Sequence, residues 1–212
     1  IYVTRANYTP CDLIDFIKSA TAKGFLVTIT TNGSLIHKHG KAMVDAGVYK
    51  VNLSVHSFED GSLSSHAEYI NDCIEFSKYA NEKGTITVFR LWNNGGNDAF
   101  NDLTIDLIEK AFSVNIDKTV KSYTVKKGVY LEHGDKFTWP DLCCEEGDGK
   151  VFCYGLKDHF GILSNGTIVP CCLDREGVIN LGNAIGGDIL SALNGERATK
   201  IRNGFKARNA VE

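Results

Sequence analysis

The chain has 212 residues, of which 43% are hydrophobic and 23% charged, and its formal net charge is −3. This length predicts one large domain, or one domain with a small appendage, and the composition is that of an ordinary globular protein. A slightly acidic chain without a basic run is not typical of nucleic-acid binding, and no apolar run is long enough to cross a membrane. We therefore expect no nucleic-acid partner and no membrane association.

Seven cysteines occur in the chain, which shows no signal or transit peptide. Cysteines in a chain without export features indicate a reducing compartment, so we expect a cytoplasmic protein. Cys73 falls on the apolar side of a predicted helix and is expected to be a small core residue. Cys11 receives no role. Cys143-Cys144 lies in an acidic loop, where adjacent cysteines cannot easily form a relaxed disulfide.

Residues 10–112 alternate between helical and extended patterns. Apolar residues recur at helical spacing in 10–24, 36–47, 67–84 and 102–112. Between them, runs rich in β-branched and apolar residues predict buried strands at 25–30, 49–55 and 85–92. A strand and a helix that alternate in this way are typical of parallel βαβ units, so the sequence predicts an α/β fold.

After residue 112 this alternation ends. The pattern then predicts a β-ribbon at 123–131, a loop at 135–149, a hairpin at 162–169 and helices at 188–194 and 196–205. We therefore expect two regions, 1–125 and 126–212.

The predicted hairpin carries a pair of cysteines. Cys153 is followed by twelve residues, then Gly166, four residues and Cys171. Asn165-Gly166 is a strong hairpin signal, so the turn would bring Cys171 back toward Cys153. Two such thiolates indicate a metal or cluster site before a disulfide, and because zinc also accepts thiolates the spacing does not name the metal. Cys172 is ranked below Cys171, because it would point the opposite way on a strand.

Polar residues lie at or near the carboxyl ends of the three predicted strands. They are Asn32, Ser54 and Arg90, and the carboxyl ends of parallel strands are where functional groups collect. An amide, a hydroxyl and a guanidinium suit a polar ligand with a carboxylate and sugar hydroxyls. Simpler alternatives remain, namely a turn, an ordinary strand residue and a structural ion pair. His56 is expected to be a hydrogen-bonded scaffold residue, and the solvated histidines are expected to be His37, His39 and His66.

Several segments resemble radical S-adenosylmethionine enzymes. These are Thr-Ile-Thr-Thr-Asn-Gly at 28–33, Asn-Leu-Ser-Val-His-Ser-Phe at 52–58 and Val-Phe-Arg-Leu-Trp at 88–92. Segment 151–183, with its Pro-Cys-Cys-Leu-Asp-Arg-Glu-Gly, resembles the SPASM or twitch extension of that superfamily. The resemblance implies a partial (β/α)6 TIM-type barrel of parallel strands, followed by a small subdomain of a cysteine-bearing β-hairpin and a helix.

The same resemblance implies a cofactor and its site. Asn32, Ser54 and Arg90 would face S-adenosylmethionine, with Ser54 near the ribose and Arg90 near the methionyl carboxylate. Cys153 and Cys171 would be ligands of an auxiliary iron–sulfur cluster, and a [4Fe–4S] cluster would cleave the cofactor. A hydrogen atom would then be abstracted from a peptide, a protein or a peptide-derived cofactor. The electron donor would be a protein such as flavodoxin or ferredoxin.

The chain departs from that family in three places. The family's cysteine triplet, spaced by three and then two residues, does not occur in the 212 residues. Its Gly-Glu-Pro motif would fall near 5–7, which here read Arg5-Ala6-Asn7, and the remaining auxiliary-cluster cysteines would follow Glu212. We expect both ends of the protein to be missing from this chain, and the chain by itself to be inactive.

Two other classes of protein are alternatives to this enzyme class. The runner-up is a non-catalytic α/β scaffold that holds a structural zinc or iron–sulfur site and acts as a binding protein. A nucleotide-binding dehydrogenase is disfavoured, because no glycine-rich dinucleotide loop follows a strand.

Overall fold

The computed structural model describes residues 2–4, 10–57, 62–96, 99–136, 140, 148–150 and 152–211. The chain divides into two compact units, one of residues Ile1–Phe137 and one of residues Thr138–Glu212. Cys143-Cys144 and Arg5-Ala6-Asn7 lie outside the described residues, as does the side chain of Cys11.

The first unit is built on a six-stranded sheet with the strand order β1-β2-β3-β4-β6-β5. The strands are β1 (Tyr2–Thr4), β2 (Thr28–Thr31), β3 (Lys50–Leu53), β4 (Ile86–Asn94), β5 (Ser122–Lys126) and β6 (Val129–Asp135). All neighbouring strands pair in parallel except β5, which pairs antiparallel with β6 at the edge of the sheet. The fold is therefore a mixed α/β fold with a predominantly parallel sheet.

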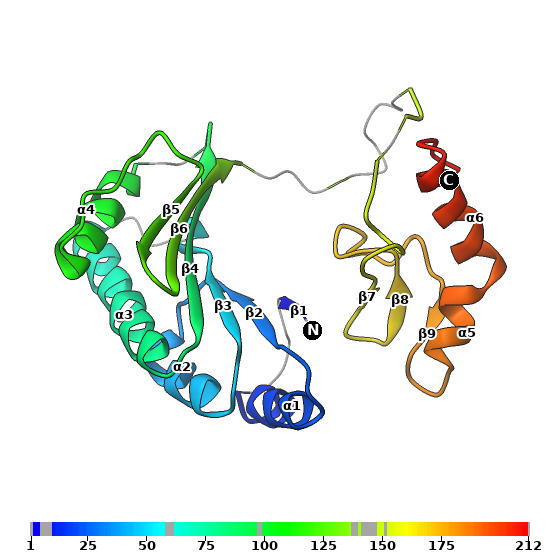
Figure 1. Ribbon diagram of the computed structural model, residues 1–212, viewed down its shortest axis with the longest axis horizontal. Helices are drawn as coiled ribbons and strands as arrows, with labels where there is room; N and C mark the ends of the chain where they lie inside the picture. Colours follow the sequence, from blue (N-terminus) through cyan, green and yellow to red (C-terminus); the bar gives the residue numbers. More distant parts are fainter. Residues whose placement is uncertain are drawn as a thin grey trace. The chain divides into compact units, whose positions relative to one another are not determined.

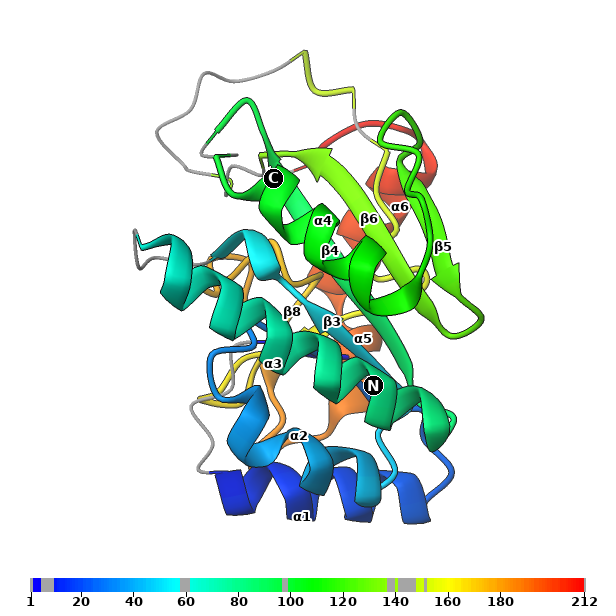
Figure 2. The same cartoon turned by 90° about the vertical axis from the view of Figure 1, so that its left-hand side faces the viewer.

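Four helices lie on one face of this sheet (Figures 1 and 2). They are α1 (Pro10–Ala22), α2 (Ile36–Asp45), α3 (Leu63–Glu82) and α4 (Asn101–Phe112). A short 3-10 helix, η1 (Val55–Ser57), follows β3. The predicted apolar side of α3 is buried as expected, at Ile70, Cys73, Ile74 and Ser77.

The two faces of the sheet differ because neighbouring residues of a strand point to opposite sides. Val51, Phe89 and Leu131 are fully buried and belong to the hydrophobic core that the sheet shares with the helices. The residues directly before and after each of them in its strand therefore project from the other face. On β4 and β6, register places Arg90 beside Glu132 there.

Three features of the first unit differ from the prediction. Phe25 and Leu26 were expected in a buried strand, but they precede β2 and are 51% and 62% exposed. The ribbon expected at 123–131 forms β5 and β6, and β6 also joins the main sheet in parallel with β4. The first unit therefore extends to Phe137 rather than to residue 125. The described strands form an open sheet with β1 and β5 as its edges, so a closed barrel is not shown.

The second unit contains the predicted hairpin. Strands β7 (Gly161–Ile162), β8 (Thr167–Val169) and β9 (Gly182–Asn183) form an antiparallel sheet, followed by α5 (Ile189–Asn194) and α6 (Glu196–Lys206). Gly166 adopts a φ of 84° in the turn between β7 and β8, a conformation that glycine adopts without strain. Leu156, Ala198 and Ile201 form the buried core of this unit.

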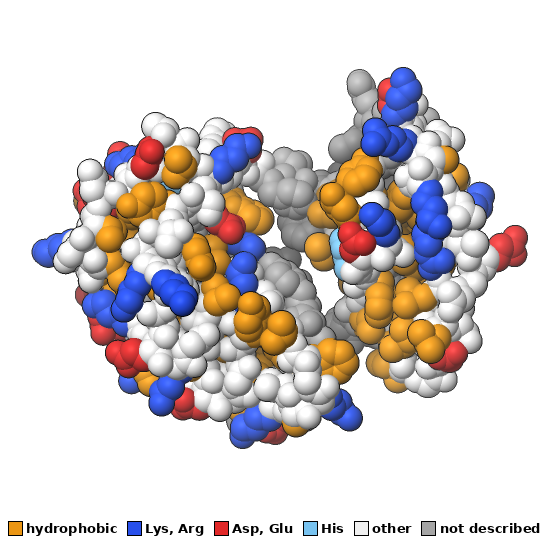
Figure 3. Space-filling view, viewed as in Figure 1, with side chains coloured by type: hydrophobic (Ala, Val, Ile, Leu, Met, Phe, Trp, Pro, Cys, Tyr) orange, Lys and Arg blue, Asp and Glu red, His pale blue; other side chains and the backbone are white. Residues whose placement is uncertain are grey.

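Charged side chains of both signs are interspersed over the visible face of the first unit, whereas Lys and Arg gather over α6 of the second (Figure 3). Exposed basic residues on and just after α6 are Arg197, Lys200, Lys206 and Arg208. Among the helices that the structure describes, none combines the length and the apolar character that crossing a membrane requires.

The packing of α2 against α3 leaves little room for a side chain at Gly40. A Cβ atom at Gly40 would lie 2.5 Å from Cδ2 of Phe76 and 3.2 Å from Cγ1 of Ile36. Because Phe76 is buried, the ring has little room to move away. We expect Gly40→Ala to lower the free energy of unfolding by about 1–2 kcal/mol, since overpacking outweighs the helix propensity gained. Urea unfolding measures this change, with Lys38→Ala on the exposed side of α2 as the control, and a stabilised Gly40→Ala variant would contradict it.

Candidate functional site

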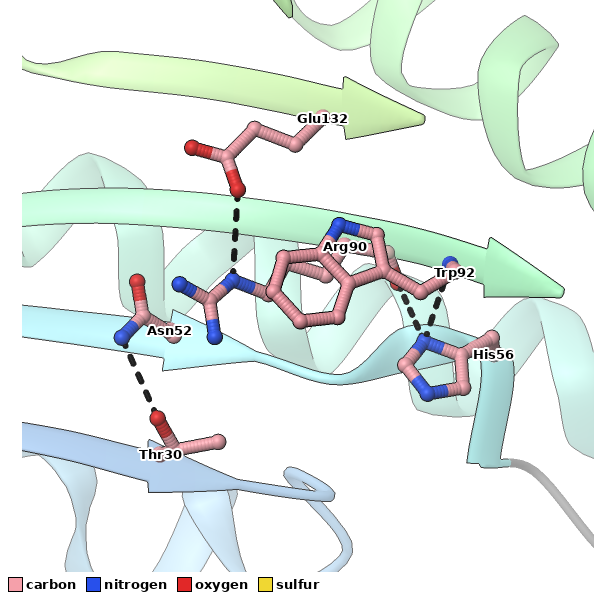
Figure 4. Close-up of polar contacts among 6 residues, drawn as sticks. All are labelled: Thr30, Asn52, His56, Arg90, Trp92 and Glu132. Atoms are coloured by element: carbon pink, nitrogen blue, oxygen red, sulfur yellow. Dashed lines mark hydrogen bonds and ion pairs between the residues drawn. The ribbon is translucent and has the colours of Figure 1, made fainter. Parts of the chain in front are cut away.

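A polar cluster lies on the face of the sheet opposite the helices (Figure 4). Nε of Arg90 lies 3.3 Å from Oε2 of Glu132, and the two side chains are 12% and 28% exposed. The Arg90 guanidinium carbon lies 4.3 Å from the centre of the Trp92 ring, within range of a cation–π contact. An ion pair and an aromatic ring therefore fix the orientation of Arg90. The structural ion pair that was the simpler alternative for Arg90 is therefore present, with Glu132 as the partner.

The next strands of this face carry a second polar contact. Nδ2 of Asn52 donates a hydrogen bond of 3.1 Å to Oγ1 of Thr30. Asn52 is fully buried, so its amide belongs to the fixed structure of the sheet rather than to its surface. Polar groups thus continue across β2, β3, β4 and β6, a pattern that an apolar core face would not tolerate.

His56 binds the backbone of β4. Its Nδ1 lies 2.9 Å from the carbonyl oxygen of Arg90 and 3.3 Å from the backbone nitrogen of Trp92. These contacts agree with the scaffold role expected for His56.

Asn32 and Ser54 follow neighbouring strands, and each takes part in local structure. Oδ1 of Asn32 accepts hydrogen bonds from the backbone nitrogen of Ser34 at 3.2 Å and from its hydroxyl at 2.9 Å. The backbone nitrogen of Ser54 donates to the carbonyl of Thr31 at 2.8 Å, which extends the pairing of β3 with β2. Asn32 therefore forms the turn that was its simpler alternative. The cofactor roles of Asn32, Ser54 and Arg90 stay predictions.

The turn that carries Asn32 is packed against α3. The Tyr69 hydroxyl donates a hydrogen bond to the carbonyl of Asn32. A Cβ atom at Gly33 would lie 3.0 Å from Sγ of Cys73, and Gly33 has a φ of 76°. Burial raises the pKa of Cys73 to about 12, so this thiol stays neutral and acts as a packing group, as the sequence predicts.

His66 is buried, so the prediction that it is solvated is wrong. It is only 1% exposed, its Nε2 lies 2.8 Å from Oγ1 of Thr104, and its ring stacks on Phe100 at 4.6 Å. Burial lowers the pKa of His66. Helical spacing is the signal that would have found it, because His66 lies four residues before Ile70 on the buried side of α3.

A small cavity of about 20 Å³ lies beside His66. Its polar lining comprises His56, His66, Asn93, Asn101 and Thr104. The Asn93 and Asn101 amides donate to each other, with both hydrogen bonds at 3.0 Å, and so join the end of β4 to the start of α4. A polar cavity of this size has room for a single water molecule.

In the second unit the hairpin brings Cys171 toward Cys153. Sγ of Cys153 accepts a hydrogen bond of 3.2 Å from the backbone nitrogen of Gly155. Backbone groups of Leu173 and Asp174 hydrogen-bond to Cys171. Burial raises the pKa of Cys171, and the nearby thiols, Cys153 among them, raise it further. Sulfur atoms held in this way offer thiolate ligands once a cation offsets their mutual repulsion.

Gly155 accounts for the close approach of the two segments. A Cβ atom there would lie 3.1 Å from the carbonyl oxygen of Pro170 and 3.3 Å from Sγ of Cys153. A larger residue would push apart the segments that carry the two cysteines. Thiolates suit both iron–sulfur clusters and zinc. Within the described residues, no group of three or more histidine, cysteine, aspartate or glutamate side chains is arranged to hold a metal.

The buried His66 predicts a dependence of stability on pH. Its pKa is lower in the folded protein than the ordinary value of 6.5, so the unfolded chain binds the proton more tightly. The contribution of His66 to the free energy of unfolding should therefore be fully present above pH 6.5 and be lost as the pH drops below it. Denaturant unfolding at several pH values measures this loss. His66→Gln should reduce it, the exposed His37→Gln should not, and an equal fall in both variants would contradict the assignment.

Comparison with known proteins finds a family match within the second unit. Residues 153–211 match SPASM, described as an iron-sulfur cluster-binding domain. The chain is also similar to a crystal structure of D-psicose 3-epimerase in the presence of D-fructose, with 12% identity and a TM-score of 0.31. That match covers 45% of this chain and 44% of the epimerase, so the chain spans less than half the length of that relative and the likeness carries no argument. No curated protein sequence was found to match the chain. The C-terminal part of the chain is thus similar to iron–sulfur cluster-binding domains of the SPASM type.

Proposed function

We propose that this chain is part of a radical S-adenosylmethionine enzyme, with Cys153 and Cys171 as ligands of an auxiliary cluster. The match of residues 153–211 to SPASM carries the proposal, since this domain is typical of that class. The predominantly parallel sheet of the first unit, with polar side chains on the face away from its helices, supports it.

The residues around the two cysteines suit an iron–sulfur cluster. When bound, the cluster would supply electron transfer. The backbone hydrogen bonds of Gly155, Leu173 and Asp174 would stabilise negative charge on the two sulfurs. Hydrogen bonds to cluster sulfurs are one means by which a protein sets a reduction potential.

The first unit would bind S-adenosylmethionine. Arg90 uses its Nε toward Glu132, and a guanidinium has further N–H donors for a carboxylate such as that of the methionyl group. Ser54 would lie near the ribose and Asn32 at the same edge of the sheet. When bound, S-adenosylmethionine would accept one electron and supply the radical that abstracts a hydrogen atom from the substrate, while Asn32, Ser54 and Arg90 would hold it in place.

The substrate and the electron donor are proposed from the resemblance. A peptide, a protein or a peptide-derived cofactor is the proposed substrate class. A protein such as flavodoxin or ferredoxin is the proposed donor, in the cytoplasm. The second candidate is a non-catalytic scaffold with a structural zinc or iron–sulfur site, favoured by the fact that the 212 residues contain no cysteine triplet of the catalytic type and read Arg5-Ala6-Asn7 where Gly-Glu-Pro would fall.

The nature of the metal distinguishes these candidates. After anaerobic reconstitution with iron and sulfide, we expect the chain to be brown and to retain both elements. Cys153→Ser and Cys171→Ser should each reduce the bound iron by more than half, because each removes a thiolate ligand. Cys172→Ser, an exposed neighbour, should retain it. Colourless protein that binds zinc and retains no iron would contradict the cluster and support the scaffold.

Arg90→Ala tests the cofactor site. Removing a charged hydrogen-bond donor should weaken S-adenosylmethionine binding by about 10- to 100-fold. Isothermal titration calorimetry with the full chain measures the affinity, and the surface variant Arg175→Ala serves as the control. Unchanged affinity in a folded Arg90→Ala variant would remove Arg90 from the site.

A further inference from the structure

We propose that His56 is a positioning residue, which holds the part of β4 that carries Arg90 and Trp92. Its ring takes the place of the backbone partner that β3, which ends at Leu53, does not provide there. The inference rests on the proposed function only where it concerns cofactor binding. Its structural part rests on three contacts, from the His56 ring to two backbone groups and from the Arg90 guanidinium to the Trp92 ring.

The strands β3 and β4 differ in length. Their ladder ends with Leu53 opposite Phe89, whereas β4 continues to Asn94. If the ladder continued, the residue opposite Leu91 would bond to the two backbone groups that flank Leu91 in a parallel pair, the carbonyl of Arg90 and the N–H of Trp92. The chain instead turns into η1 after β3, so that residue is not available.

The His56 ring occupies this position. Its Nδ1 lies 2.9 Å from the carbonyl oxygen of Arg90 and 3.3 Å from the nitrogen of Trp92, the same two groups. A protonated Nδ1 donates to the carbonyl, and a deprotonated Nδ1 accepts from the N–H. Either tautomer therefore forms a hydrogen bond with one of the two groups.

His56 contacts β4 close to a point where the pairing on the other side of the strand is irregular. On the other side of the strand, the pairing with β6 becomes irregular between Trp92 and Asn94. Backbone pairing with β6 is therefore irregular directly after Trp92, the residue that carries the ring. η1 itself is fixed, because Val55 is 1% exposed and Ser57 bonds to the carbonyl of Ser54 at 3.0 Å.

The position of the Arg90 side chain depends on this backbone. The guanidinium reaches Glu132 on one side and stacks on Trp92. A shift of the β4 backbone would move both Arg90 and the ring on which it stacks. We therefore assign to His56 the alignment of the guanidinium that would meet the methionyl carboxylate, without direct contact between His56 and the cofactor.

The experiment compares three substitutions of His56 in a Trp139→Phe background, in which Trp92 is the remaining tryptophan. Asn places an amide nitrogen close to the position of Nδ1, so His56→Asn can still donate to the Arg90 carbonyl. His56→Gln places its amide farther along the side chain, and His56→Phe has no polar atom. His37→Asn, an exposed histidine on α2, is the control.

Two measurements are made on each folded variant, with a thermal unfolding curve to verify folding. Trp92 fluorescence reports the environment of the ring without any cofactor, and calorimetry reports S-adenosylmethionine affinity. We expect His56→Phe and His56→Gln to shift the Trp92 emission and to weaken affinity about tenfold, the usual effect of one lost hydrogen bond. His56→Asn should retain both properties within about twofold.

The outcomes separate this inference from the proposed function. If the parent protein does not bind S-adenosylmethionine but His56→Phe still shifts the Trp92 emission, the cofactor site fails and the positioning role stands. If His56→Phe leaves both measurements unchanged, the positioning role is overturned. It is also overturned if His56→Asn loses as much as His56→Phe, since the hydrogen bond from Nδ1 would then not be what matters.

Discussion

The two-residue period of the parallel strands is the constraint on which the first unit depends. It directs Val51, Phe89 and Leu131 into the core beneath the helices and leaves the intervening residues on the opposite face. A shift of one residue in β4 would exchange its two sets of side chains, bury Arg90 among apolar residues and separate it from Glu132. The apolar core and the polar cluster are therefore two results of one register.

Much of this fold could be predicted from the sequence, because its signals are local. Helical periodicity located α1 to α4, and Asn165-Gly166 located the turn of the hairpin. The parallel pairing of β6 with β4 could not be predicted in this way, because Val129 meets Thr87 across more than 40 residues of chain. Nothing in the alternating pattern of a ribbon specifies a third strand as its neighbour.

The site was predictable to a smaller extent. Residue type and strand position indicated Arg90 as a candidate site residue, and the predicted turn indicated Cys171. The partners of these residues could not be predicted, because they depend on tertiary structure. Glu132 was missed because the register of β4 and β6 is what places it beside Arg90. His66 was misassigned because its burial depends on Phe100 and Thr104, which lie on another part of the chain.

The paired amides of Asn93 and Asn101 have a consequence for sequence variation. Each amide is both donor and acceptor to the other, so the pair is satisfied without charge. Aspartate at either position would lose one donor and set two acceptors against each other. Substitutions at these two positions should consequently occur together in related proteins, as a coupled change at the junction of β4 and α4.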